Sequence, residues 1–417
     1  MPKSKIATWT GWLVVAFSMA MGVIGSFGFA SHARFHSRIE KLELDGELVS
    51  LDDQIHIVED EKDDAITYLL NAAKPAHDIY LKSPYCETDT SFQDSVPTFE
   101  KLMEEHPDVF ENIDKAIAAP DSSVVFDLKS DRFLSALYLQ KIGFVLGWKG
   151  HVHNAKGQFN EAAKTSIDMM KLAETSESRT IIDSLLGVAI RSQAMDIAYD
   201  AVASNKVDDE LVTTICKMLE HTTPMANYKS ALETERSISV YYLINPELSY
   251  SSDFELETEP SGLEQLASLI PAGAVIVQGN CFLDMMEKAI ENSELALSIQ
   301  TAEQEPKWSI VNAFSMNYYQ PAYNNIRNAF GESLAKTRAA RIAIALQTTD
   351  GAAQRDSWTE EYLVSIDVPR EMTIDPFADK TMIIKREDDQ WHVYSKGPNS
   401  DGGDEAESAE RIGAFPR

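Results

Sequence analysis

The chain begins with an uncharged segment, residues 6–33, whose apolar centre spans residues 11–30. About 20 apolar residues in a helix that rises about 1.5 Å per residue cover the ~30 Å hydrocarbon layer of a bilayer. The apolar core of a cleaved signal peptide is shorter, at about 7 to 15 residues. Residues 1–33 are therefore predicted to form a signal-anchor and transmembrane helix that contacts the lipid bilayer through residues 11–30.

The charges beside this segment do not fix its orientation by number alone. Lys3 and Lys5 precede it, whereas Arg34, Arg38 and Lys41 follow it, and the cytoplasmic flank is normally the more basic one. A short basic leader before the first apolar segment is typical of a signal-anchor. The bulk of the chain is therefore predicted to be extracytoplasmic, on the periplasmic side of the inner membrane.

Cleavage of the segment is the alternative. Ala30 and Gly28 are small residues at the positions that a signal peptidase would read. No later segment is long and apolar enough to span a bilayer, so an uncleaved chain is predicted to be a single-pass membrane protein.

The body of the chain has a helical pattern over residues 35–346. Apolar residues recur there at spacings of three and four, and proline-containing breaks divide the region into helices of ordinary length. Residues 249–262 are polar and acidic, and they predict a linker between a helical domain, residues 34–248, and a second helical part, residues 263–349. The predicted fold class is mainly α.

A helical hairpin is predicted over residues 134–175. Gly150 and Gly157 lie seven apart, and Phe159 and Ala162 follow them. This segment resembles a tetratricopeptide unit, in which a small residue lies where two helices cross, a glycine makes the turn, and an aromatic residue and an alanine pack the second helix. An array needs about three repeats and no second copy is evident, so the resemblance implies a helical-repeat-like body.

Towards the C-terminus the pattern becomes strand-like. Residues 381–386 and 390–395 carry β-branched and aromatic side chains on either side of an acidic turn, which predicts a β-hairpin. Residues 375–404 run from Asp-Pro-Phe to Tyr-Ser-Lys-Gly-Pro-Asn-Ser-Asp-Gly, and they resemble the C-terminal end of type II secretion major pseudopilins. The resemblance implies a small α+β module over residues 350–404, followed by a disordered acidic tail, residues 405–417.

The chain departs from that family at its N-terminus. A pseudopilin begins with a glycine cleavage site, a phenylalanine and then a glutamate inside the apolar helix, whereas residues 1–30 contain no acidic residue. The module is therefore expected to be carried on a helical body and not polymerised. In this layout the chain resembles membrane-anchored helical bacterial proteins.

The pseudopilin resemblance also implies a calcium site in the loop after the hairpin. Asn399, Ser400, Asp401 and Asp404 would supply the oxygen ligands that Ca²⁺ prefers, and the Gly-Gly pair between the two aspartates would allow a tight wrap. The alternative is a solvated acidic segment without bound metal. No other cofactor is expected.

Composition excludes several functional classes. The chain has 37 Lys+Arg against 66 Asp+Glu and a net charge of −29, so it lacks the basic stripe of a nucleic-acid-binding protein. Cys86, Cys216 and Cys281 have no zinc-knuckle spacing, although one disulfide between two of them stays open. His151 and His153 would point about 200° apart on a helix, so they are not expected to share a metal.

Four basic residues form an island in this acidic chain: Arg327, Lys336, Arg338 and Arg341. Arg338 and Arg341, three residues apart, would lie on one helix face. The functional interpretation is a docking site for an anion or an acidic partner. The other interpretation is that these side chains pair with the protein's own carboxylates.

No motif for nucleophilic catalysis, phosphate binding or zinc-dependent hydrolysis is present. We therefore expect a membrane-anchored, extracytoplasmic helical scaffold that binds protein partners and has no catalytic residues. Two alternatives stay open. One is an accessory component of an envelope secretion or pilus-like assembly, and the other is an enzyme such as a hydrolase, whose site is assembled from scattered residues.

Overall fold

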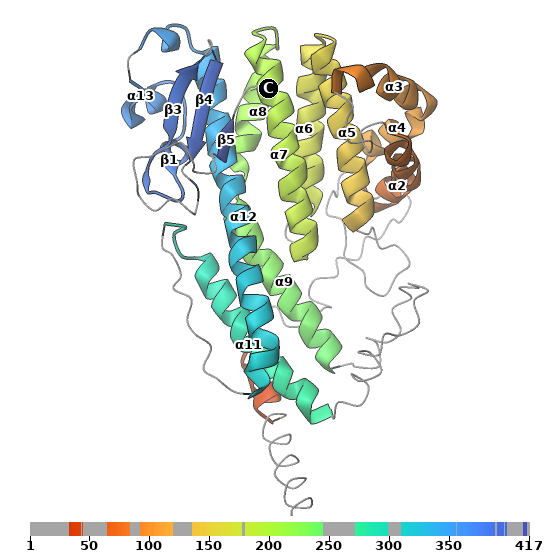
Figure 1. Cartoon of the computed structure of the whole chain (residues 1–417), viewed down its shortest axis with the longest axis vertical. Helices are drawn as coiled ribbons and strands as arrows, with labels where there is room; N and C mark the ends of the chain where they lie inside the picture. The colour runs from red at the N-terminus through yellow and green to blue at the C-terminus, as the bar shows by residue number, and fades with distance from the viewer. Residues whose placement is uncertain are drawn as a thin grey trace, which may run out of the picture. The chain divides into compact units, whose positions relative to one another are not determined.

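The structure is a computed structural model that describes residues 33–42, 44, 65–83, 92–119, 136–176, 180–244, 272–298, 310–355, 357–387, 390–395, 397 and 412–414. These residues are mainly helical, with a small β-hairpin region near the C-terminus, which confirms the predicted fold class at this level (Figure 1). A first helix covers residues 33–42. The labelled α-helices are α2 (Ala65–Lys82), α3 (Phe92–Glu105), α4 (Pro107–Ala118), α5 (Ala136–Ala155), α6 (Phe159–Ser176), α7 (Ile181–Ala203), α8 (Asp209–His221), α9 (Pro224–Ile244), α11 (Ala272–Ser293), α12 (Ile310–Thr348) and α13 (Glu360–Ser365).

The predicted transmembrane segment lies outside the described residues, apart from Ala33 at its end. Among the helices that the structure describes, none combines the length and the apolar composition needed to cross a membrane.

Contacts divide the chain into two units. The first holds the described residues of Met1–Gln54, Glu233–Glu291 and Glu303–Tyr323, and the second holds the described residues of Ile55–Leu232, Asn292–Ala302 and Asn324–Arg417. This division does not follow the predicted boundaries at residues 248 and 349. It falls inside α9, near the end of α11 and inside α12.

The first unit is organised around the helix over residues 33–42. Phe35, Ile39 and Leu42, at spacings of four and three, are buried in one cluster with Val240 of α9 and Leu283 of α11. Side chains at these spacings share one helix face, so a single apolar stripe attaches this helix to the unit.

An ion-pair network on α11 reinforces that attachment. Arg38 lies 2.6 Å from the Asp284 carboxylate and 2.8 Å from that of Glu287, and it also donates to the carbonyl of Asn280 at 3.0 Å. Arg34 adds a longer contact to Asp284, at 3.8 Å. The helix that directly follows the predicted membrane segment is thus fixed by both apolar and charged contacts.

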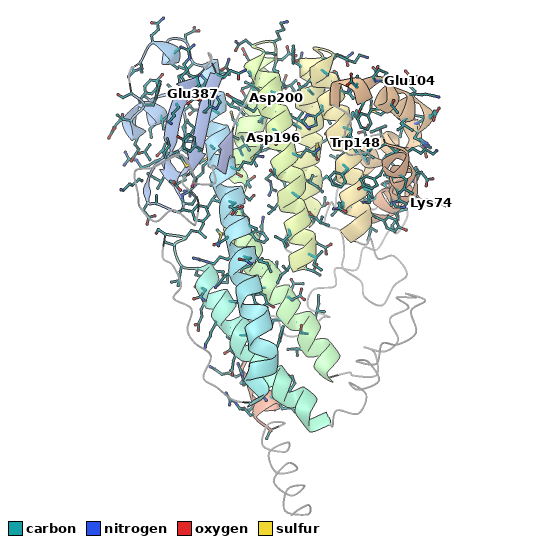
Figure 2. All side chains as sticks on the ribbon, in the orientation of Figure 1. Lys74, Glu104, Trp148, Asp196, Asp200 and Glu387 are labelled. Carbon is teal, nitrogen blue, oxygen red and sulfur yellow. The ribbon has the colours of Figure 1, made fainter. Side chains whose placement is uncertain are left out.

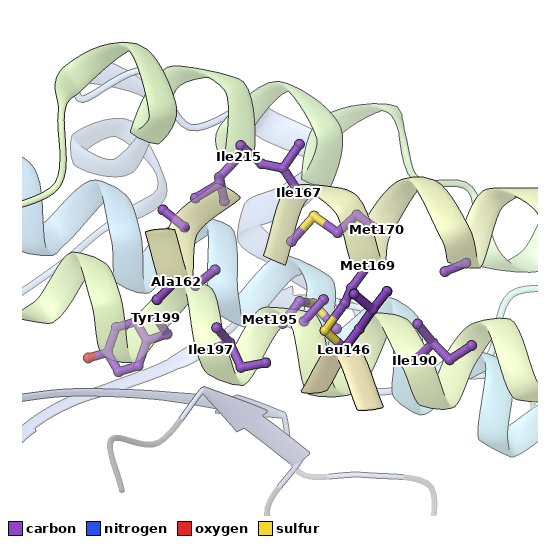
Figure 3. Close-up of a cluster of buried hydrophobic side chains, with 14 of the residues drawn as sticks. Leu146, Ala162, Ile167, Met169, Met170, Ile190, Met195, Ile197, Tyr199 and Ile215 are labelled. Carbon is purple, nitrogen blue, oxygen red and sulfur yellow. The ribbon is translucent and has the colours of Figure 1, made fainter. Parts of the chain in front are cut away.

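The second unit is built on α5, α6 and α7, which lie side by side (Figure 1). Helix α2 packs on α4 and α5, α3 packs on α5, and α8 packs on α6. Their shared core contains Leu146 of α5, Met169 and Met170 of α6, and Ile190 and Met195 of α7, all almost completely buried (Figure 3). Burial of each such side chain stabilises the fold by roughly 1.5–3 kcal/mol.

The C-terminal module contains two small antiparallel sheets. Strands β1 (Ile374–Asp375) and β2 (Lys380–Thr381) form one, and β3 (Ile383–Glu387), β4 (Gln390–Ser395) and β5 (Ile412–Ala414) form the other in the order β3-β4-β5. The predicted hairpin is present as β3 and β4, with Ile383 opposite Tyr394. Thr381 differs from the expectation, because it pairs with Ile374 in the first sheet.

Strand β5 lies within residues 405–417, where the sequence predicts a disordered acidic tail. Its three residues pair with Val393, Tyr394 and Ser395 of β4. Ile412-Gly413-Ala414 is an uncharged stretch in the acidic tail, and it pairs with the second half of β4, which composition alone does not predict.

Candidate functional site

The helical hairpin predicted over residues 134–175 is present as α5, a turn and α6. Gly157 has φ +70°, a conformation that glycine adopts without strain, and Ala162 is fully buried at the start of α6. The helix crossing, however, involves α7. An added Cβ would lie 2.7 Å from Ile190 at Gly143, 2.1 Å from Gln193 at Gly147 and 2.8 Å from Ile197 at Gly150. This glycine stripe lets α5 approach α7 closely.

Replacing Gly150 with alanine should therefore destabilise the second unit. The new methyl group would press on the branched side chain of Ile197, and overpacking of this kind costs roughly 1–3 kcal/mol, offset by up to about 1 kcal/mol of gained helix propensity. Gly147→Ala is the matched control, because there the methyl group meets the flexible end of Gln193. Urea denaturation should show a net loss only for Gly150→Ala, and equal stability of the two variants would contradict the close approach.

The four basic residues of α12 are bonded within the protein. Lys336 and Arg341 pair with carboxylates, as the second interpretation of the basic island predicts, whereas Arg327 and Arg338 donate to backbone carbonyls. Lys336 lies 2.8 Å from the carboxylate of Asp196 of α7 and donates to the Ser192 hydroxyl at 2.7 Å. Asp196 is labelled in Figure 2. Arg327 donates to the carbonyls of Leu295 and Ala296, both at 3.1 Å. These contacts use donors of both side chains within the protein.

The other two members of the island connect α12 to the C-terminal module and to α8. Arg338 donates to the carbonyl of Ile374 at 2.7 Å. Arg341 is almost completely buried, lies 2.7 Å from the Glu220 carboxylate of α8 and donates to the carbonyl of Asp367 after α13. Although three residues apart, the two arginines have different partners and form no shared binding site.

A buried carboxylate organises the turn that the sequence singled out as Asp-Pro-Phe. Asp375 Oδ1 accepts hydrogen bonds from the backbone N–H of Phe377 at 2.9 Å and from the Ser395 hydroxyl at 2.7 Å. Ser395 in turn accepts from the N–H of Gly397 at 3.0 Å. One aspartate therefore joins the first sheet of the module to the end of β4.

Two ionisable groups on α7 are strongly affected by burial. Burial lowers the pKa of the Arg191 guanidinium to about 10, although the Glu174 carboxylate opposes the shift. Burial also raises the pKa of Tyr199 to about 12. The Tyr199 hydroxyl donates to the carbonyl of Trp391 in β4 at 2.8 Å, so it connects the helical bundle to the module.

The stability of the Tyr199→Phe variant, compared with the wild-type protein at two pH values, should reveal that hydrogen bond. A phenol whose pKa is raised in the folded state contributes stability that is complete below pH 10 and is lost as pH rises towards 12. At pH 8 the variant should be less stable by about 1–2 kcal/mol, because the buried carbonyl loses its donor. This difference in stability should be smaller at pH 11, because ionisation of the Tyr199 phenol lowers the stability of the wild-type protein and the variant has no phenol at this position. Thermal melts at both pH values measure the difference, and a constant deficit would contradict this assignment.

A column of aromatic rings between α2, α3 and α5 was not anticipated from the sequence. Tyr80 stacks on Phe144 with centroids 5.6 Å apart and lies parallel to Trp148 at 6.0 Å. Phe99 lies on Trp148 at 4.7 Å. Phe99 and Trp148 belong to the core (Trp148 is labelled in Figure 2), whereas Tyr80 and Phe144 are half-buried. The column therefore runs from the core to the surface.

A lysine lies at the outer part of this column. The ammonium of Lys141 lies 3.6 Å from the centroid of Tyr80 and 5.8 Å from that of Phe144. Tyr138, one turn earlier on α5, is 41% exposed. The spacing of Tyr138, Lys141, Phe144 and Trp148 along one helix face could have been read from the sequence, but Tyr80 is too distant in the chain to be assigned to it.

The residues predicted to bind calcium, Asn399, Ser400, Asp401 and Asp404, lie outside the described residues. Within the part of the chain that is described, no group of three or more His, Cys, Asp or Glu side chains could hold a metal ion. His151 and His153 lie on α5, and His153 Nδ1 is 2.7 Å from the Gln158 side-chain oxygen. Cys216 is a free thiol whose pKa is raised by burial.

Comparisons of the chain with protein-family models, with curated proteins and with solved structures find no match.

Proposed function

We propose that the chain is a membrane-anchored, extracytoplasmic helical scaffold that binds protein partners through its second unit. The observation that supports this best is the aromatic column, whose half-buried outer rings lie at the surface of a closely packed set of helices. Tyrosine and other aromatic side chains are enriched at protein interfaces, because they bury a large area with little loss of side-chain entropy. The bonds of Lys336, Arg338 and Arg341 favour a second unit that presents this surface as one rigid platform.

The contacts of the helix over residues 33–42 support the proposed orientation. Arg34 and Arg38 follow the segment proposed to cross the membrane, and both are paired with Asp284 of the body. In this proposal the two arginines lie on the extracytoplasmic side, where the carboxylate of Asp284 neutralises part of their charge. Lys3 and Lys5 are then the basic residues on the cytoplasmic side, in agreement with a signal-anchor.

Two measurements test this proposal. An alkaline phosphatase domain fused after Arg417 should be active, since this enzyme requires an oxidising compartment. A photo-crosslinking amino acid placed at Tyr138 should give discrete protein adducts in native membranes, with Lys101, on the exposed surface of α3, as a comparison position. An inactive fusion, or a monomer at every crosslinking position, would overturn the scaffold proposal.

A second candidate is an accessory role in an envelope secretion or pilus-like assembly. The pairing of Ser395 with Ile412 favours it, because this pairing brings together the two ends of the segment that contains Asp401 and Asp404. A closed loop holds oxygen ligands near one another at a lower entropic cost than an open tail. Calcium should then raise the melting temperature of the full chain, and Asp401→Asn with Asp404→Asn should abolish that rise. A melting temperature that does not respond to calcium would exclude this role for the loop.

A further inference from the structure

The face of α5 that carries the aromatic column has a graded exposure. Tyr138, Lys141, Phe144 and Trp148 follow one another at spacings of three, three and four, so they lie along one side of the helix. Tyr138 is 41% exposed, Phe144 is half-buried and Trp148 is only 6% exposed. Tyr80 of α2 stacks beside them at 18° to Phe144 and 5° to Trp148. The exposed fraction of these side chains therefore increases from Trp148 in the core, through Phe144, to Tyr138 at the surface.

Lys141 gives this face a charge. Its ammonium lies over the Tyr80 ring, yet a ring face takes up none of the three N–H donors of a lysine in a conventional hydrogen bond. Among the described residues no carboxylate forms a salt bridge with Lys141, whereas Lys156, Lys164, Lys229 and Lys336 each have one. In a chain with a net charge of −29, a cation held at a partly exposed aromatic surface is suited to receive a carboxylate.

We propose that Tyr80, Tyr138, Lys141 and Phe144 form a binding site for a short peptide segment of a partner protein, in which an acidic residue lies within a few positions of an aromatic or leucine side chain. The carboxylate contacts Lys141, and the apolar side chain packs against Tyr138 and Phe144. This inference deepens the proposed scaffold function and depends on it.

Charge decides between a peptide and other anionic partners. An anionic bilayer or a nucleic acid presents many charges at once and is bound by clusters of basic residues, each contributing about 1 kcal/mol at a membrane surface. This face carries one lysine on a strongly acidic chain, so a polyanionic surface would be repelled overall. A single carboxylate next to an apolar side chain matches both the one cation and the aromatic rings.

Selection from a random peptide library displayed on phage tests the site. The target is the full-length protein in detergent, and the selected peptides are then synthesised and titrated against the protein. The enriched sequences should place Asp or Glu near Phe, Tyr, Trp or Leu. Lys141→Gln and Tyr138→Ala should each weaken their binding by about tenfold, since a charge-assisted contact and a buried aromatic ring each contribute on this scale.

Lys115→Gln is the matched control, because Lys115 lies 5.9 Å from the Tyr68 ring, in another part of the same unit, and should leave peptide binding unchanged. Equal melting temperatures of all variants would show that folding is preserved. Selection of basic peptides, or binding that is insensitive to Lys141→Gln, would overturn the proposal. Binding of the protein to phosphatidylglycerol vesicles is measured in parallel. If Lys141→Gln weakens binding to the vesicles but not to any peptide, the peptide-site proposal is also overturned.

Failure of this inference can be distinguished from failure of the scaffold proposal. If crosslinks in native membranes identify partner proteins but Lys141→Gln does not weaken any of them, the scaffold proposal stands and the peptide site is rejected. If the selected peptides bind in a Lys141-dependent way while no native adduct forms at any position, the site is real and the scaffold role is rejected.

Discussion

Replacing Arg341 with methionine should lower the free energy of unfolding of the second unit by about 3 kcal/mol or more. The side chain of Arg341 is 4% exposed, and its Nε lies 2.7 Å from Glu220, whose side chain is only 28% exposed. Removing one member of a buried ion pair leaves the other charge without compensation, which typically costs about 3–5 kcal/mol. The variant also loses the donor to the carbonyl of Asp367, a residue held at φ +68°. Methionine fills most of the arginine volume, so a cavity contributes little to the loss.

Urea denaturation of the full chain, followed by far-UV circular dichroism, measures this effect. Glu220→Gln is the matched control, because it removes the opposite charge but keeps an oxygen that can accept from Arg341, and it should cost less than Arg341→Met. The double variant Arg341→Met with Glu220→Leu should recover part of the stability, since it leaves no buried charge. A stability of Arg341→Met equal to that of the wild-type protein would mean that solvent already satisfies Glu220.

The parts of the fold that were predictable from sequence are those set by neighbouring residues. The turn between α5 and α6 needs a positive φ and has Gly157 there, and the strands β3 and β4 are separated in the sequence by the acidic pair Asp388-Asp389. Such features depend on local geometry and on the period of apolar residues. The tetratricopeptide and pseudopilin resemblances remain predictions, because a helical hairpin and a β-hairpin occur in many folds.

Features that depend on distant residues were not predictable in the same way. Arg338 and Arg341 lie three residues apart on α12, as expected, but their partners, the carbonyl of Ile374 and the carboxylate of Glu220, belong to different elements. Tyr80 joins the aromatic column by stacking on Phe144, which lies 64 positions later in the sequence. Sequence periodicity shows which side of a helix is apolar, but it does not show which other helix will cover that side.

The lysine contacts of the second unit show the same limit for the candidate site. Lys141 and Lys336 are equivalent in sequence terms, since both lie in helices and near aromatic or small residues. In the structure Lys336 is fixed by Asp196 and Ser192, whereas Lys141 lies on the ring of Tyr80. Only the folded arrangement therefore separates a lysine that stabilises the protein from a lysine that can contact a partner.

The second large effect is expected at Asp375, and it concerns the C-terminal module. Asp375→Ala removes the acceptor for the Phe377 N–H and for the Ser395 hydroxyl, in a site where Asp375 is 2% exposed and Ser395 is fully buried. Loss of two hydrogen bonds to a buried carboxylate should destabilise the module by about 3 kcal/mol. The loss also removes an anion close to the guanidinium of Arg338, whose pKa is already lowered by burial.

Asp375→Asn separates these two contributions. The amide keeps an oxygen for Phe377 and Ser395 but removes the negative charge, so it should cost only about 1 kcal/mol. The rings of Trp358 and Trp391 meet edge to face with centroids 5.2 Å apart, so the contribution of these two of the six tryptophans to the fluorescence reports on the packing of the module in urea. We expect this signal to change at a lower urea concentration than the helical signal in Asp375→Ala, because the module loses its internal connection while the contacts among α5, α6 and α7 are unchanged, although both parts contribute to one buried cluster. Simultaneous loss of both signals would instead show that the module and the bundle unfold as one cooperative unit, coupled through the hydrogen bonds of Tyr199 and Arg338 to the module.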